Sequence, residues 1–124
     1  KDGKDVCIIA MGLMVPIALK EAEMLEAEGI SAAVVNMHTV KPIDAETILA
    51  MNEKCKGIVT AEEHSVIGGL GSAVAEVLAG HDGAKFERVG IQDKFGKSGK
   101  PDELFAAYGL TAENIVEKCK ATLA

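Results

Sequence analysis

Two acids, a histidine and three glycines lie within one short segment, "VTAEEHSVIGGLGSAVAEVL", which spans residues 59–78. A carboxylate beside an imidazole can relay protons. Glycines at the start of a helix can bring backbone N–H groups close to an anion. Ordinary strand-to-helix turns contain the same residues, because glycine adopts backbone conformations that other residues avoid. The segment therefore fits an acid/base cluster, an anion-binding loop or a structural turn.

The acid/base interpretation depends on which side chains share a face. Adjacent residues of an extended segment point to opposite sides, so Glu62 and His64 share a side and Glu63 does not. A proton-transfer site also needs a third group and a substrate pocket. The pattern favours a structural role, in which one acid accepts N–H groups of the loop and His64 lies at the surface or at an interface.

The glycines do not match the common phosphate-binding motifs. Gly69 and Gly71 form a G-x-G pair, but Val74 stands where the dinucleotide fingerprint has its third glycine. No GKS or GKT of a P-loop follows them. A generic anion site at the N-terminus of the next helix stays open, although Glu62 and Glu63 would place negative charge beside it.

Four apolar or alternating segments are typical of strands. They are "VCIIA" (Val6–Ala10), "AAVVNM" (Ala32–Met37), "GIVTAE" (Gly57–Glu62) and "FERVGI" (Phe86–Ile91). Helical patterns lie between them, and such alternation is typical of a parallel sheet that is covered on both faces. The sequence therefore predicts an α/β fold, a three-layer α/β/α domain with a mostly parallel sheet of four to five strands. Ligands of such sheets bind at the carboxyl ends of the strands, where the segment 59–78 has its glycines.

The helices are predicted from apolar residues that recur at helical spacing. In the first helix Lys20, Glu21, Glu23 and Glu26 are expected on the solvent side. Asp44 is expected to cap the second helix, because a carboxylate before the first turn can accept free N–H groups. A final helix is expected to turn inward four residues: Ile115, Val116, Cys119 and Leu123.

Length and composition limit the classes of function. The 124 residues suit one domain, 1–124, and no apolar run reaches the roughly 20 residues that cross a bilayer. A net charge of −6, with three Phe, one Tyr and no Trp, disfavours nucleic acid as a partner. The three widely spaced cysteines suggest neither a disulfide framework nor a zinc site, so a reducing compartment, the cytoplasm, is expected. The opening "KDGKD" fits a mature cytoplasmic protein or a piece of a longer one.

Three stretches resemble the C-terminal domain of transketolase. They are "GLMVPIALKEAEMLEAEGISAAVVNMHTVKPID" (12–44), the segment 59–78, and "FGKSGKPDELFAAYGLTAENIV" (95–116). This domain also occurs in deoxyxylulose-phosphate synthases and in the beta subunits of 2-oxo-acid dehydrogenases, which remain alternatives within the family. The third stretch favours transketolase over these relatives, as a C-terminal part or as the short subunit of a split enzyme.

The resemblance implies a role in assembly. In this family thiamine diphosphate and Mg²⁺ lie on the N-terminal domain, the middle domain of the other subunit holds the aminopyrimidine ring, and the C-terminal domain supports the dimer. No catalytic, cofactor-binding or metal-binding residue is therefore expected within 1–124. The intact enzyme would transfer a two-carbon ketol unit between sugar phosphates. Its partners would be the remaining transketolase domains or subunit and a second copy, in a homodimer or a split-subunit assembly.

The resemblance implies that the segment 59–78 contains a structural loop, which faces the rest of the subunit or its partner. At least one of its glycines is expected at positive φ. Its residues are Glu62, Glu63, His64, Gly68, Gly69 and Gly71. The alternative is a free-standing α/β module that binds an anion or nucleotide at the carboxyl ends of its strands.

The resemblance also implies a strand order. The family sheet has the order 1-3-2-4-5, with an antiparallel first strand. Without that strand, the four strands expected here lie in the order 2-1-3-4. Ala32–Met37 would then form an uncovered edge, whose unpaired N–H and C=O groups invite association.

Overall fold

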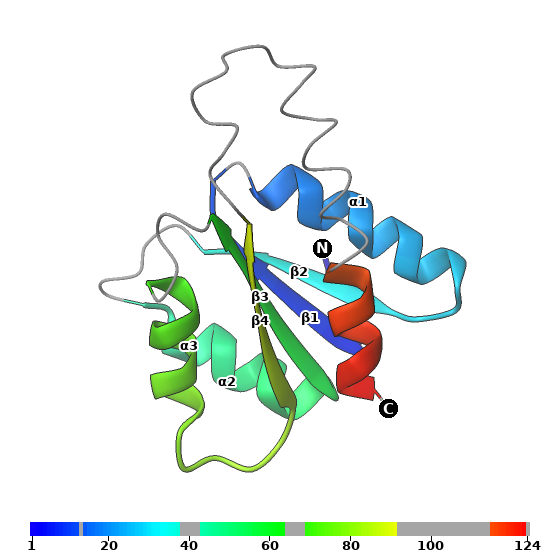
Figure 1. The fold of residues 1–124 in the computed structure, drawn as a ribbon. Coiled ribbons are helices and arrows are strands. Elements are labelled where there is room, and N and C mark those ends of the chain that lie inside the picture. Colours follow the sequence, from blue (N-terminus) through cyan, green and yellow to red (C-terminus); the bar gives the residue numbers. More distant parts are fainter. Residues whose placement is uncertain (13, 38–42, 64–68, 92–114, 124) are drawn as a thin grey trace, which may run out of the picture.

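The computed structural model describes residues 1–12, 14–37, 43–63, 69–91 and 115–123 (Figure 1). Strands and helices alternate along these residues, and residues 115–123 add a final helix. Their order is β1 (Val6–Ala10), α1 (Met14–Ala27), β2 (Ala32–Asn36), α2 (Ala45–Lys54), β3 (Gly57–Glu63), α3 (Leu70–Leu78) and β4 (Lys85–Ile91). Among the described residues, no helix is both long enough and apolar enough to span a bilayer.

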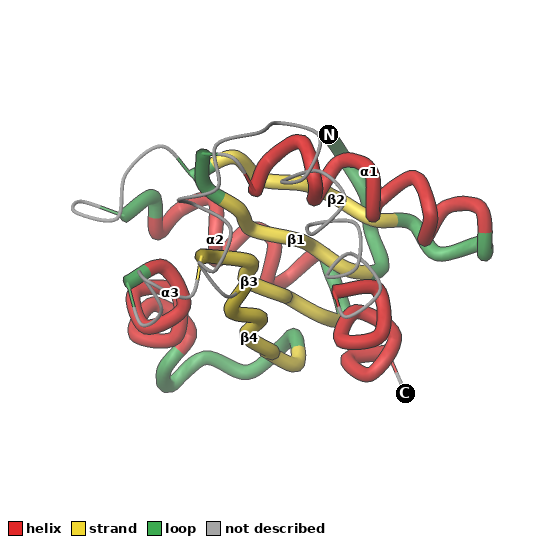
Figure 2. The backbone as a smooth tube through the Cα atoms, turned by 45° about the horizontal axis from the view of Figure 1, so that its top comes forward, coloured by secondary structure: helices red, strands yellow, loops and turns green. Residues whose placement is uncertain are grey.

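The described strands form one parallel sheet in the order β2-β1-β3-β4. This is the order 2-1-3-4 that the family resemblance implied. Figures 1 and 2 show α1 and helix 115–123 on one face of the sheet and α2 and α3 on the other. The predicted three-layer α/β/α architecture is therefore confirmed.

The central strand β1 shows why the sheet needs both layers. All five residues of "VCIIA" are fully buried. Because successive side chains of a strand point to opposite faces, Val6 and Ile8 join the cluster under α1, whereas Cys7 and Ile9 join the cluster under α2 and α3. An apolar strand of this kind is stable only where helices remove both faces from water.

Local signals fix the helix ends. Asp44 caps α2 as predicted, because its carboxylate accepts the N–H of Thr47 at 3.2 Å. At the other end of α1, Gly29 has φ +82°, and the N–H of Ile30 donates to the carbonyl of Leu25 at 3.0 Å. Glycine reaches this conformation without a Cβ clash, so α1 stops there.

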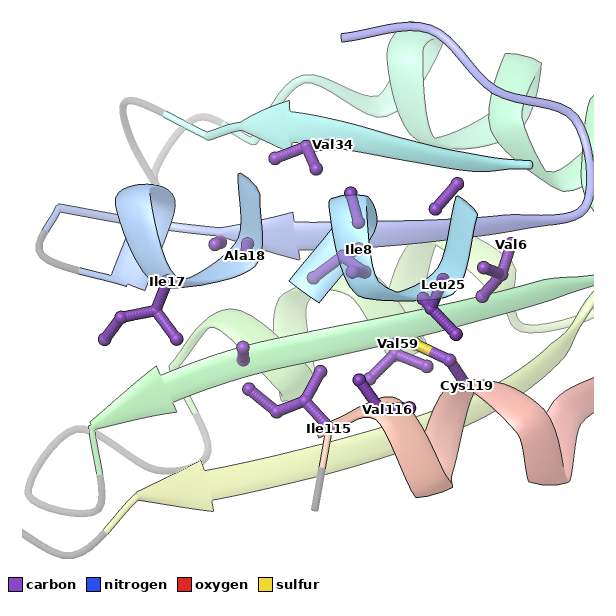
Figure 3. Close-up of a cluster of buried hydrophobic side chains, with 14 of the residues drawn as sticks. Val6, Ile8, Ile17, Ala18, Leu25, Val34, Val59, Ile115, Val116 and Cys119 are labelled. Carbon is purple, nitrogen blue, oxygen red and sulfur yellow. The ribbon is translucent and has the colours of Figure 1, made fainter. Parts of the chain in front are cut away.

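One polar residue of α1 departs from the prediction. Glu21 was expected on the solvent side together with Lys20 and Glu23, which are exposed, but its side chain is 0% exposed. The reason is that helix 115–123 packs beside α1 on the same face of the sheet. Figure 3 shows Leu25 of α1 in one cluster with Val116 and Cys119.

The outer edge of β2 is covered by the start of the chain. The N–H of Val34 donates to the carbonyl of Lys1 at 3.1 Å, and the α-amino group of Lys1 donates back to the carbonyl of Val34 at 3.3 Å. Lys1 Nζ also donates to the carbonyl of Ala32 at 2.9 Å. A Cβ on Gly3 would lie 2.3 Å from the carbonyl carbon of Ala32, so only glycine allows this approach. The predicted uncovered edge is therefore wrong for Ala32 and Val34.

The connection from α3 to β4 is held by a buried amide. Asn52 Nδ2 donates to the carbonyl of Asp82 at 3.0 Å, and the N–H of Ala84 donates to Asn52 Oδ1 at 2.8 Å. Because the side chain of Asn52 satisfies both backbone groups, the connection needs no regular structure of its own. These two hydrogen bonds fix the position at which β4 begins. This matters for function because β4 contributes one residue to the candidate site.

Candidate functional site

The candidate site lies where β3 ends and α3 begins, at the carboxyl edge of the sheet. Glu62 and Glu63 are the last two residues of β3. Gly69 is the N-cap of α3, and Gly71 lies in its first turn. His64 and Gly68 fall outside the described residues, so their predicted places in the loop stay predictions.

Glu62 supplies the missing cap of α3. Its side chain is 3% exposed, and Oε2 accepts the N–H of Gly71 at 2.8 Å. Gly69 has no side chain with which to cap the first-turn N–H groups. A carboxylate at this end is stabilised both by the hydrogen bond and by the positive end of the helix dipole. Glu62 thus accepts an N–H group, as the sequence suggested for one of the two acids.

Arg88 completes the site from β4. Its Nη2 donates to Ser72 Oγ at 3.4 Å, and its Nε would lie 2.4 Å from a Cβ on Gly71. Arg88 was not predicted as a site residue from the sequence, because the residues that it contacts lie on α3, in another part of the chain. The strand pairing could have found it, since Arg88 stands opposite Thr60 in the parallel register, two residues before Glu62 on the same face.

The site is poorly suited to an anion. One of the free N–H groups at the N-terminus of α3, that of Gly71, is already bound by the Glu62 carboxylate, so fewer are left for a phosphate. The other oxygen of that carboxylate, Oε1, is buried without a hydrogen-bond partner among the described residues. An anion at this end of the helix would therefore lie beside a buried acidic side chain.

The described residues offer neither a metal cluster nor a reactive thiol. They contain no group of three or more His, Cys, Asp and Glu residues that could hold a metal ion. Cys7, Cys55 and Cys119 are free and buried. Burial raises the pKa of all three thiols, that of Cys119 to about 12, so the reactive thiolate is not populated at neutral pH. These cysteines are packing residues.

The two described glycines of the site, Gly69 and Gly71, do not have positive φ. Gly69 has φ −69°, and Gly71 lies within α3 and is not among the described glycines with positive φ. Positive φ was expected of at least one of the three glycines, and Gly68 lies outside the described residues, so that expectation stays a prediction. Gly71 is needed for space instead, because a Cβ there would lie 2.4 Å from Arg88 Nε and 2.9 Å from Glu62 Oε2.

Replacing Gly71 by alanine is expected to destabilise the protein by about 1 kcal/mol, because it displaces the Glu62 carboxylate from the helix end. The lost charge-assisted hydrogen bond, about 1.5–3 kcal/mol, outweighs the roughly 1 kcal/mol that alanine gains over glycine within a helix. Urea unfolding measures the difference. In an Arg88→Ala background the loss should be smaller, because the nearest contact is gone. A Gly71→Ala variant as stable as the parent would contradict the role assigned to this glycine.

Comparison with known proteins places these features in a family. Residues 1–115 match the family model described as "Transketolase, C-terminal domain". A solved structure titled "Split gene transketolase, inactive beta4 tetramer" is 51% identical, with a TM-score of 0.82, over 99% of this chain and 40% of that chain.

Two named relatives show how much of a longer protein this chain represents. It is 50% identical over 116 residues to the 6-deoxy-6-sulfo-D-fructose transketolase subunit SqwH of Clostridium sp. (strain MSTE9), covering 94% of this chain and 36% of the relative. It is 40% identical over 124 residues to the 1-deoxy-D-xylulose-5-phosphate synthase of Symbiobacterium thermophilum, covering 99% of this chain and 19% of the synthase. The chain thus spans little more than a third of the subunit and about a fifth of the synthase. By the family match, the shared sheet and the identities, the chain belongs to the transketolase C-terminal domain family.

Proposed function

We propose that residues 1–124 form one domain of a transketolase, which supports the assembly of the enzyme and leaves catalysis to its other domains. One observation carries this proposal: the Glu62 carboxylate occupies the N-terminus of α3. In an open α/β sheet the carboxyl edge is where a ligand would bind. Here the protein's own acid fills that place.

The complete enzyme would transfer a two-carbon ketol unit between sugar phosphates with thiamine diphosphate and Mg²⁺. The described residues do not fit this cofactor, since they hold no carboxylate cluster for Mg²⁺ and Glu62 would repel a diphosphate. The cofactor is therefore assigned to the remaining domains or subunit. One relative at 50% identity is named for a sulfo-sugar. Identity at this level therefore does not decide which sugar the complete enzyme would use.

The loop between β3 and α3 is assigned to an interface with the rest of the subunit or with a second copy. Its residues are Glu62, Glu63, His64, Gly68, Gly69 and Gly71. Support comes from the hydrogen bond between Glu62 and Gly71, which holds the two ends of the loop together. A loop whose ends are fixed loses less conformational entropy when a partner binds.

A cytoplasmic location is proposed with this function. All three cysteines of the chain are free and buried. Proteins of oxidising compartments more often pair their cysteines in disulfides. The buried thiols therefore fit a reducing compartment.

The isolated chain is expected to bind no thiamine diphosphate and to transfer no ketol unit. Cofactor binding needs oxygen ligands for Mg²⁺, and carbanion chemistry needs a positioned acid in a site that excludes water. Titration of the purified chain with thiamine diphosphate and Mg²⁺ in a calorimeter should show no saturable heat. Coexpression with the remaining transketolase domains should give ketol transfer.

A matched titration separates the alternative function. If the chain is instead a free-standing anion-binding module, inorganic phosphate or a nucleotide should give saturable heat that an Arg88→Ala variant loses. Micromolar binding of thiamine diphosphate, or turnover by the chain alone that His64→Ala abolishes, would contradict the assignment to assembly.

A further inference from the structure

A buried acid lies on α1, far from the candidate site. The side chain of Glu21 is 0% exposed, and within the part of the chain that the structure describes neither of its oxygens has a hydrogen-bond partner. Surface glutamates of a helix normally keep their carboxylates in water, because an unpaired buried charge is costly. Glu21 is not needed for the proposed assembly role, so its burial calls for a separate explanation.

Glu21 faces helix 115–123. Residues three and four apart share a side of a helix, which places Glu21 on the same side of α1 as Ala18 and Leu25, whose cluster includes Val116 and Cys119 of helix 115–123. Glu28 Oε1 pairs with Nζ of Lys120 on helix 115–123 at 2.5 Å. After burial itself, the charge of Glu21 is the cause that raises the pKa of the Cys119 thiol.

The surroundings of Glu21 are apolar. Figure 3 shows Ala18 and Leu25, the neighbours of Glu21 along α1, in the cluster that helix 115–123 joins through Val116 and Cys119. The strands beneath contribute apolar side chains to this cluster. Among described residues, the titratable and charged groups that face Glu21 are the Cys119 thiol and, at the rim, the Glu28–Lys120 pair. None of them donates a hydrogen bond to Glu21.

We propose that Glu21 makes the docking of helix 115–123 on α1 depend on a proton, because the helix covers this side chain far more favourably when its carboxyl group is neutral. Burial raises the pKa of Glu21 from 4.5 to about 9, in the direction that an unpaired acid in an apolar contact requires. When the helix lifts away, water reaches the group and it ionises. Undocking therefore releases a proton.

The direction of the pH dependence follows from this proton. Below pH 4.5 the carboxyl group is protonated whether the helix is docked or not, so docking is at its strongest. Between 4.5 and about 9 the docked form holds a proton that the undocked form has lost. The undocking equilibrium then rises about tenfold for each pH unit. Above the pKa of the docked form, the undocking equilibrium constant no longer changes with pH.

Amide hydrogen exchange of the 124-residue chain tests the proposal. Exchange rates of residues 115–123 are measured by NMR at about pH 6, 7 and 8 in the parent and in Glu21→Gln, which cannot ionise. Dividing the parent's exchange rate by that of Glu21→Gln cancels the intrinsic effect of pH on amide exchange. This ratio should rise about tenfold per pH unit. Glu23→Gln, which removes an exposed carboxylate from the same helix, should follow the parent.

Three outcomes would overturn the proposal. The first is a rate ratio that does not change with pH. The second is equal exchange rates in helix 115–123 and β1, since the proton would then belong to global unfolding. The third is a Glu21 carboxyl carbon, assigned in the parent through couplings to its own side-chain atoms, that titrates near 4.5, the pKa of an unburied glutamate. This titration is measured on the parent, so it decides the question even if Glu21→Gln fails to fold.

Discussion

Replacing Leu25 by alanine is expected to lower the free energy of unfolding by about 2–5 kcal/mol. Leu25 is 0% exposed and lies where α1, the sheet and helix 115–123 meet (Figure 3). Removal of its side chain loses the transfer free energy of the buried atoms and leaves a cavity. Three elements bound the site, so it cannot collapse without moving one of them. Urea unfolding with a common m-value measures the loss.

Leu19→Ala is the matched control, because it makes the same change on the same helix. Leu19 is 40% exposed. Its loss should be on the order of 1 kcal/mol or less, since less apolar area leaves the interior. Equal losses at Leu19 and Leu25 would contradict the view that the contact with helix 115–123 stabilises this side of the sheet.

The layers of the fold could be predicted because the signals for them are local. An apolar "VCIIA" between polar segments specifies a strand that is buried on both faces. Asp44 lies directly before the helix that it caps, and Gly29 lies two residues after the last residue of α1. Each of these signals depends on neighbours in sequence, so one sequence is enough to interpret it. The strand order needed more, and it came from the family resemblance.

The burial of Glu21 could not be predicted from α1 alone. A charged residue beside the apolar stripe of a helix is normally solvated, and that rule holds for Lys20 and Glu23. What covers Glu21 is a helix about 100 residues further along the chain, and its position is set by the sheet between them. The covered edge of β2 has a similar cause, since Lys1 reaches Val34 only after the sheet has formed.

Only the part of the candidate site that depends on neighbours in sequence could be predicted. The pattern indicated a carboxylate that accepts N–H groups, and Glu62 does so. Gly69 and Gly71 do not have positive φ, and the requirement at Gly71 is instead space beside Arg88 and Glu62. Crowding between residues of two strands and a helix leaves no local mark in the sequence.

Gly57→Ala is expected to lower the free energy of unfolding by about 1–3 kcal/mol, although alanine within a strand normally gains up to about 1 kcal/mol over glycine. A Cβ at this first residue of β3 would lie 1.9 Å from Thr122 Oγ1 and 2.4 Å from Thr122 Cβ. The Thr122 side chain cannot swing away cheaply, because it is 4% exposed and its hydroxyl donates to the carbonyl of Cys119 at 2.7 Å. Helix 115–123 would have to move off the sheet.

A double-mutant cycle isolates this contact. Thr122→Gly removes both atoms that the new Cβ would meet, so Gly57→Ala should cost much less in that background than in the parent. Urea unfolding of the parent, both single variants and the double variant gives the coupling energy. Additive losses would mean that the strain lies elsewhere. A coupling of 1 kcal/mol or more, on the order that contacting residues show, would establish that the missing side chain at Gly57 is what lets the C-terminal helix lie against β3.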